Sequence, residues 1–350
     1  MLITDAPVAV VFSAARTLTP ALAQAFPAAH VITDTAEVSV ADGPAVARAA
    51  QAAGATAIIT PYETGLPAGA YARTVLGLPG TPVTSAVAAS DKLIMKRRFR
   101  AAGLPIMPFR VVHSPQQLRA WAEDRDVVAK PLFGGGSAGV YRIGAELPDY
   151  RYPVLCEDAA SVLAEYHVDG IVDDGQFWAA VSRYHEPMLT SARAQRPYSS
   201  TTIDPADSGE ALELARRAVA AVRLRASVFH LELFATPSGW VVSEIACRPA
   251  GGGIPRALQL AYGVDLVRAS WQFDCGQRPE WQPHEYRPIA HLALPATITE
   301  EQRARLAALP GHLETTRAAA GPGFYSATNA GCCYVDPGAI DAARALLEDA

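Results

Sequence analysis

A segment rich in glycine carries the clearest chemical signal in the sequence. Residues 126–140, DVVAKPLFGGGSAGV, combine an apolar run, a lysine and four glycines within six positions. Glycines let backbone N–H groups wrap an anion closely, and Lys130 places a positive charge beside them, which suits the β- and γ-phosphates of a nucleotide. The segment has neither the Gly-Lys-Ser/Thr of a Walker A loop nor the G-x-G-x-x-G dinucleotide pattern. A flexible hairpin between two strands is the alternative interpretation.

Two glutamates flank a predicted turn further along the chain. Thr-Pro-Ser-Gly at 236–239 separates two apolar runs, which predicts a β-hairpin. Centring the turn on Ser238 pairs Thr236 with Trp240, Phe234 with Val242 and Glu232 with Glu244. Two like charges directly opposite each other on a hairpin are destabilising, so a cation is expected between the two glutamates, and their carboxylate oxygens suit Mg²⁺. A register shifted by a bulge, with one glutamate facing solvent, is the alternative.

The second arm of this hairpin leads into an arginine and three glycines. Arg248 lies four residues beyond Glu244 and precedes Gly251, Gly252 and Gly253. A guanidinium next to a metal-bound phosphate can hold a carboxylate or stabilise a developing oxyanion. The alternative is a structural arginine in front of a turn.

The elements that must position these residues differ along the chain. Strand-like runs at 8–12, 31–32 and 57–60 alternate with helical stretches at 17–26 and 43–53. Strands that alternate with helices favour a parallel sheet covered on both faces. A helix capped by Ser90 is then predicted to run through DKLIMKRRFRAA and to stop at Gly103.

Strand runs follow one another more closely after this helix. Close spacing favours antiparallel pairing. The runs lie at 127–129, 154–156, 165–172, 177–181, 228–234 and 240–245. From residue 287 onward, a strand, a helix near 299–308 and GCCYVDPG before a terminal helix predict a small closing module. The expected domains are therefore 1–88, 89–286 and 287–350.

The composition limits the class of protein and of partner. With 350 residues, 50% of them apolar, the chain can bury a core in two to three domains. A net charge of −5 gives no electrostatic reason to bind nucleic acid or an anionic membrane, so a small-molecule partner is expected. Five cysteines without a C-x-x-C pair, and the lack of an export signal or long apolar run, lead us to expect a cytoplasmic protein.

The order of the motifs resembles the ATP-grasp superfamily, and within it the carboxylate–amine ligases that include L-amino-acid ligases and carnosine-synthase-like enzymes. The resemblance is strong over residues 90–260. It rests on S-D-K-L-x-M-K with G-L-P downstream, V-V-A-K-P with its glycine loop, H-L-E-L-F, and E-I-x-x-R-P-x-G-G-G. It implies an α/β and α+β fold with an N-terminal parallel domain, central subdomains with antiparallel sheets and a small C-terminal module.

The resemblance also implies ATP as cosubstrate, Mg²⁺ or Mn²⁺ as the metal, and a role for each matching residue. Phosphate contacts fall to Lys92 and Lys130, the lid to Gly134, Gly135, Gly136 and Ser137, and metal ligation to Glu232 and Glu244. Adenine recognition falls to Glu157 through Ala159, with Asp158 as the alternative hinge residue, and ribose recognition to Glu165. Catalysis falls to Lys130 and Arg248, with the backbone of Gly252 and Gly253 next to the substrate.

The implied reaction activates a carboxylate, expected to belong to an amino acid, as an acyl phosphate and joins it to an amine. The products are an amide or peptide bond, ADP and phosphate. The expected partners are thus a small acid and an amine, and a homodimer is left open. Two departures from the family pattern concern the site: Ala246 stands where many relatives carry a metal-binding Asn, and the spacing between Glu157 and Glu165 is not the usual one.

Substrate identity is less well encoded, and rival functions stay open. Basic residues after the ribose segment are expected to line the substrate pocket, with surface positions as the alternative. They are Arg183, His185, Arg193 and Arg196, with Tyr184 among them. His230 is predicted to be a packed strand histidine. A biotin-carboxylase-like or purine-pathway enzyme is the rival within the fold, and a nucleotide-binding module without catalysis is the rival outside it.

Overall fold

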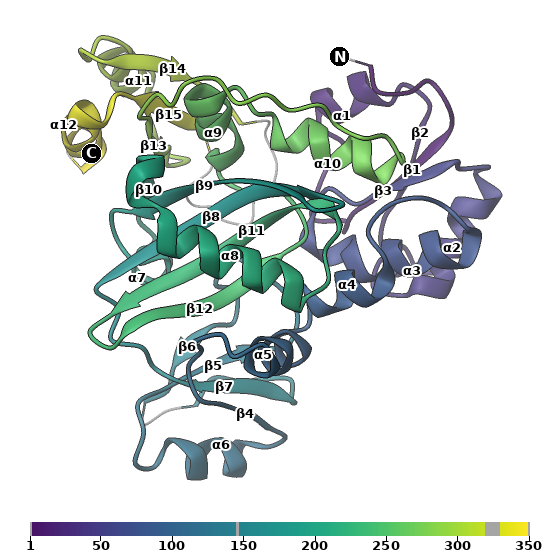
Figure 1. The fold of residues 1–350 in the computed structure, drawn as a ribbon, viewed down its shortest axis with the longest axis horizontal. Helices are drawn as coiled ribbons and strands as arrows, with labels where there is room; N and C mark the ends of the chain where they lie inside the picture. The colour runs from purple at the N-terminus through teal and green to yellow at the C-terminus, as the bar shows by residue number, and fades with distance from the viewer. Residues whose placement is uncertain (1, 145–146, 319–329, 349–350) are drawn as a thin grey trace.

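A computed structural model of the chain describes residues 2–144, 147–318 and 330–348. The described strands form three sheets, which Figure 1 shows as an N-terminal part, a large central sheet and a small sheet at one end. This mixture of one parallel and two antiparallel sheets confirms the predicted α/β and α+β fold class.

The N-terminal sheet is parallel, with the order β2-β1-β3. Its central strand, Val8–Val11, is buried on both faces, as expected for an apolar β-branched run in a parallel sheet. The strands are β1 (Val8–Val11), β2 (Ala29–Ile32) and β3 (Ala57–Ile59). The helices are α1 (Pro20–Ala25), α2 (Gly43–Ala52), α3 (Leu66–Leu76) and α4 (Val83–Ala88), with the 3-10 turn η1 (Glu63–Gly65).

Helix α5 (Lys92–Ala101) connects this part to the small sheet. The carboxylate of Asp91 accepts hydrogen bonds from the N–H groups of Leu93 and Ile94, so Asp91 is the N-cap and the predicted cap at Ser90 was wrong by one residue. Gly103 follows the helix with a φ of 64°, a conformation that favours glycine.

The small sheet is antiparallel, with the order β4-β7-β5-β6. Helix α6 (Pro115–Ala122) packs against it through the buried Leu118. The strands are β4 (Phe109–Val112), β5 (Val127–Pro131), β6 (Tyr141–Arg142) and β7 (Val154–Asp158). The glycine-rich segment is the connection between β5 and β6, so it lies at the edge of this sheet.

The large sheet has the order β12-β11-β8-β9-β10-β13-β15-β14, with antiparallel neighbours throughout the described residues. The strands of the predicted C-terminal module extend this sheet rather than forming one of their own. The strands are β8 (Ala164–Asp173), β9 (Gln176–Tyr184), β10 (Ser199–Thr202), β11 (Ala226–Thr236), β12 (Gly239–Ala246), β13 (Ala290–Ala293), β14 (His312–Thr315) and β15 (Cys332–Val335). The helical elements are α7 (Met188–Arg193), η2 (Pro205–Asp207), α8 (Gly209–Ala221), α9 (Ile254–Tyr262), α10 (Leu266–Asp274), α11 (Glu300–Ala307), η3 (Pro337–Ala339) and α12 (Ile340–Glu348).

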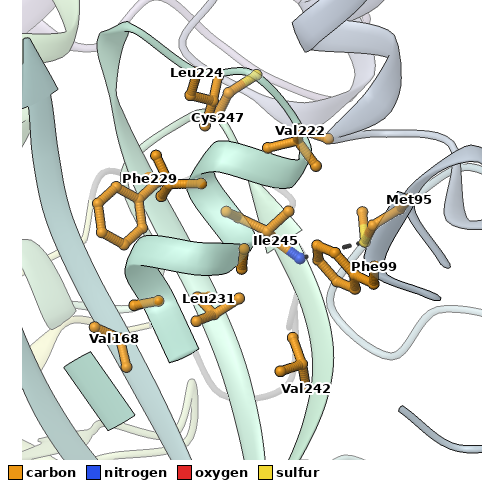
Figure 2. Packing of buried hydrophobic residues seen from close by; sticks show 14 of the residues in the cluster. Met95, Phe99, Val168, Val222, Leu224, Phe229, Leu231, Val242, Ile245 and Cys247 are labelled. Carbon is orange, nitrogen blue, oxygen red and sulfur yellow. Dashed lines mark hydrogen bonds between the residues drawn. The ribbon is translucent and has the colours of Figure 1, made fainter. Parts of the chain in front are cut away.

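A shared core fixes α5 against the large sheet. Figure 2 shows Met95 and Phe99 of α5 beside Ile245 of β12, whose N–H lies 3.4 Å from the Met95 sulfur. Leu231 and Phe229 of β11 belong to the same buried group. This packing holds the helix that carries Lys92 next to the strand that carries Glu244.

Candidate active site

A cavity of about 1460 Å³ opens where elements of all three sheets meet. Its wall includes the glycine-rich connection, the β11–β12 hairpin and the loops after β1 and β3. The structure therefore brings together residues separated by more than 150 positions in the sequence. The predicted site residues on this wall are Lys92, Lys130, Gly134, Gly135, Gly136, Ser137, Glu157, Asp158, Ala159, Glu165, Glu232, Glu244, Arg248 and Gly252.

Three lysines and two glutamates form the most highly charged part of the site. We call Lys92, Lys96, Lys130, Glu157 and Glu244 the lysine–carboxylate cluster. The ammonium of Lys130 lies 2.8 Å from one oxygen of Glu244 and 2.5 Å from Glu157. Lys96 pairs with the other oxygen of Glu157, and Lys92 lies 3.5 Å from Glu244 and also donates to the Gly134 carbonyl. Lys92 and Lys130, which are expected to contact phosphates, thus pair with protein carboxylates in the structure.

Burial and charge act in opposite directions on the acids of the cluster. Burial alone would raise the pKa of Glu244, but Lys130 and Lys92 outweigh it and hold that pKa at about 2. Burial would also raise the pKa of Glu157, but the positive charges of Lys130 and Lys96 outweigh it and lower that pKa. Both glutamates are therefore ionised at neutral pH.

The β11–β12 hairpin places Glu232 directly opposite Glu244. The predicted pairing nearer the turn was wrong, since Thr236 faces Gly239, and Val242 faces Leu233 rather than Phe234. The turn is one residue tighter than predicted, and a bulge that adds Ser243 to β12 restores the register before the glutamates are reached. The bulge considered as a rival interpretation is thus what brings the acids together.

The paired glutamates offer the kind of ligand atoms that a divalent metal ion prefers. Their side chains are 32% and 23% exposed, and both line the same cavity. Hard carboxylate oxygens from directly opposite strand positions fit Mg²⁺ or Mn²⁺. Ala246 offers no further side-chain ligand.

Arg248 has a partner that the sequence analysis missed. Its Nε donates to Glu63 at 2.6 Å, and its Nη1 donates to the carbonyl of Pro249 at 2.8 Å. Glu63 lies in η1, directly after β3, and a Cβ added at Gly135 of the glycine-rich connection would lie 3.6 Å from the Arg248 guanidinium. The only sequence signal for Glu63 was its place after a buried parallel strand, where ligands commonly bind.

Tyrosines behind the second glycine segment fix its conformation. Tyr198 donates to the carbonyl of Gly252 at 2.6 Å, and Tyr334 donates to that of Gly253 at 3.2 Å. Gly252 has a φ of 64°, and a Cβ there would lie 1.1 Å from the Tyr198 oxygen, so only glycine fits. Gly253 is not on the cavity wall, which corrects the expectation that its backbone meets the substrate.

Two of the predicted substrate residues lie outside the cavity. Side chains alternate along β9, so Tyr184 faces the cavity while Arg183 points away and lies over the ring of Tyr166. Both ring nitrogens of His185 are taken by hydroxyl groups, at 2.8 and 3.0 Å. The expectation that Arg183 and His185 line the substrate pocket is thus corrected. Arg193 does line the cavity, whereas Arg196 pairs with Glu186.

The residues expected to bind adenine and ribose also line the cavity. The carboxylate of Asp158 pairs with Arg125, and the N–H of Ala159 donates to the carbonyl of Asp126, so these groups already have protein partners. Glu165 accepts a hydrogen bond from the Met188 N–H at 2.8 Å. Burial, reinforced by Glu232, raises the pKa of Glu165 to about 8. The nucleotide contacts of these residues remain predictions.

Comparison with known proteins finds similarity in sequence and in fold, although no protein-family model matches the chain. The L-arginine-specific L-amino acid ligase of Bacillus subtilis is 27% identical over 233 residues, which are 61% of this chain and 56% of that protein. The chain thus spans about half the length of this curated relative.

Two solved structures resemble almost the whole chain. An L-amino acid ligase from Bacillus licheniformis has a TM-score of 0.73 at 15% identity, covering 98% of this chain and 97% of that one. A carboxyaminoimidazole ribonucleotide synthase from Aspergillus clavatus, complexed with ATP, has a TM-score of 0.71 at 15% identity, covering 99% and 97%. The fold is therefore shared with both. Among the described residues, no helix combines the length and the apolar character needed to cross a bilayer.

Proposed function

We propose that this chain is an ATP- and Mg²⁺-dependent carboxylate–amine ligase of the ATP-grasp superfamily. The observation that carries the proposal is the convergence of Glu232 and Glu244 with Lys92, Lys130 and the glycine-rich connection in one cavity. A module that only binds a nucleotide has no need of paired carboxylates and a partly buried arginine at the same place.

The proposed first step transfers the γ-phosphoryl group of ATP to a substrate carboxylate. Lys92 and Lys130 would exchange Glu244 for phosphate oxygens, and the N–H groups of the glycine-rich connection would cover the transferring group. Glu232 and Glu244 would hold Mg²⁺, which when bound supplies positive charge that offsets the charge of the phosphates. Closure of the glycine-rich connection would keep water from the acyl phosphate.

The proposed second step is attack of an amine on the acyl carbon. Arg248, fixed by Glu63, would face the oxyanion that develops there, and the segment at Gly252 is held rigid by Tyr198. Phosphate then leaves and an amide or peptide bond results. We propose an amino acid as the acid substrate, because the similar ligases named above act on amino acids according to their names.

A panel of acids and amines tests this proposal. Phosphate release is measured with ATP and Mg²⁺ for each pair, and mass spectrometry identifies the product. Release that needs both an acid and an amine supports the ligase. Release with bicarbonate alone would favour the carboxylase or purine-pathway rival, and tight ATP binding without turnover would favour the non-catalytic module.

The setting of this activity is also a proposal. The five cysteines are free, which supports a reducing, cytoplasmic compartment. A homodimer is the assembly to test, by light scattering of the purified chain.

A further inference from the structure

A network of buried polar side chains runs from the proposed metal site into the large sheet. Asp169 is fully buried and lies on β8, directly opposite His230 of β11. Its two oxygens bond to two histidines, at 2.9 Å to Nδ1 of His230 and at 2.6 Å to Nδ1 of His167. The proposed function gives none of these three residues a role.

The same network of side chains reaches Glu232, one of the two paired glutamates. Nε2 of His230 lies 3.6 Å from the carboxylate of Glu232, which stands two residues further along the same face of β11. At the other end, His167 bonds to Ser200 at 3.1 Å, and Ser200 bonds to His291 at 3.2 Å. The network therefore links Glu232 to strands β8, β10 and β13.

We infer that Asp169 and His230 are positioning residues for the proposed metal site, with Asp169 fixing the ring of His230 and His230 fixing the carboxylate of Glu232. The inference rests on the proposed function, since it presupposes that Glu232 binds the metal.

The unequal surroundings of the two glutamates carry this inference. Glu244 is held by two lysines, whereas the basic side chain that lies within 4 Å of Glu232 among the described residues is the imidazole of His230, at 3.6 Å. A carboxylate that bonds to one ring nitrogen fixes the ring plane and directs the other nitrogen. Partners of this kind behind metal ligands commonly change metal affinity by about 10- to 100-fold when they are removed.

The inference separates positioning from ligation. Asp169 holds Nδ1 of His230 and Nε2 lies nearest to Glu232, so we expect the ring to act on the metal site through Glu232 although it lines the same cavity. A manganese ion bound with ADP should therefore show oxygen ligands, without the nitrogen coupling of a bound imidazole.

The test measures Mn²⁺ binding to the full chain with ADP by electron paramagnetic resonance. We expect Asp169→Asn and His230→Gln each to weaken Mn²⁺ binding about 10- to 100-fold, with ADP binding in the absence of metal unchanged. The double variant should lose no more than the single ones, because Asp169 acts through His230. Ser200→Ala, at the far side of His167, is the matched control and should stay within about twofold of wild type.

Different outcomes refute the inference and the proposed function. Loss of Mn²⁺ binding in Glu232→Gln with full binding in both Asp169→Asn and His230→Gln overturns the inference and leaves the metal site standing. Nitrogen coupling that disappears in His230→Gln also overturns it, because His230 would then be a ligand. No Mn²⁺ binding by the wild-type chain overturns the metal site itself. If Asp169→Asn fails to fold, His230→Gln and its nitrogen signal still decide the question.

Discussion

Two groups of buried charges among the described residues differ in whether they face the cavity. Arg73 of α3 and Asp274 of α10 lie 2.8 Å apart with side chains only 3% and 9% exposed. Arg73 also donates to the Ile58 carbonyl and to the hydroxyl of Thr60, while Asp274 accepts from the Thr60 N–H. This pair joins the N-terminal sheet to α10, and protein groups are the hydrogen-bonding partners of both side chains.

The lysine–carboxylate cluster differs in that it opens onto the cavity. Glu244 is 23% exposed, and its lysine partners lie next to the glycine-rich connection. A closed ion pair contributes to the folded state alone, whereas an open one can exchange its partners for a ligand. From this comparison we expect Arg73 and Asp274 to serve folding, and we propose that Glu244, Lys92 and Lys130 serve binding.

Replacing Glu244 should separate binding from folding most strongly. Glu244→Gln should lower ATP turnover by about 1000-fold or more, because loss of a metal ligand removes several kcal/mol of charge stabilisation. The fold should persist, and ADP without metal should bind at least as tightly, since Lys92 and Lys130 lose their competitor. Phosphate release and calorimetry measure these effects, with Glu314→Gln on β14 as the control. Unchanged turnover in Glu244→Gln would refute the metal assignment.

Removing one partner of the Arg73–Asp274 pair should instead lower stability and leave activity unchanged. Arg73→Met leaves the Asp274 carboxylate buried without its cation, which should cost about 3–5 kcal/mol in the free energy of unfolding. Turnover per folded molecule should stay near the wild-type value. Adding Asp274→Leu should recover much of the loss, because an apolar pair can replace a buried ion pair. Denaturant unfolding and activity titrations check both points, and a marked loss of activity in the folded variant would contradict the comparison.

The two ends of the cluster can be compared in the same way. Lys130→Ala should weaken ATP binding about 10- to 100-fold, the scale of one charge-assisted hydrogen bond or a little more. Lys96 is fully buried and is not on the cavity wall, so Lys96→Ala should lower stability while ATP binding stays close to wild type. Calorimetric titration with ATP at matched folded concentrations distinguishes the two. Equal losses of affinity in both variants would contradict the division into binding and folding roles.

Most of the elements and much of the cavity wall were predictable, because they depend on local pattern. Apolar runs and glycine stops predicted most of the strands and α5 to within a few residues, whereas β4, β6, β10 and β14 were not predicted. The facing of Glu232 and Glu244 was predicted correctly, although from a turn taken to be one residue too long. The bulge at Ser243 compensated for that error, and no local pattern announces such a bulge.

Two important contacts that sequence reasoning missed join distant segments. Glu63 meets Arg248 across 185 positions, and Asp169 meets His230 across 61. The first pair follows from how two sheets lie against each other and the second from the order of strands in one sheet, and the residue pattern encodes neither. Arg183 and His185 were misplaced for a simpler reason, because the alternation of β9 was not applied to them.

The smallest effect expected concerns Glu157 and pH. The lowered pKa of Glu157 means that its contribution to stability is present above the unfolded value of 4.5 and is lost as the pH falls below it. The difference in unfolding free energy between wild type and Glu157→Gln should therefore be constant near pH 7 and shrink below pH 4.5 by up to about 1.4 kcal/mol per pH unit. Glu300→Gln, which removes a solvent-exposed partner of Arg317, should leave the stability curve nearly unchanged at every pH. Urea unfolding from pH 3 to 7 measures the three curves. A pH-independent difference would mean that the lysines do not hold Glu157 ionised, and the open cluster would then lose the charge balance that distinguishes it from the closed pair.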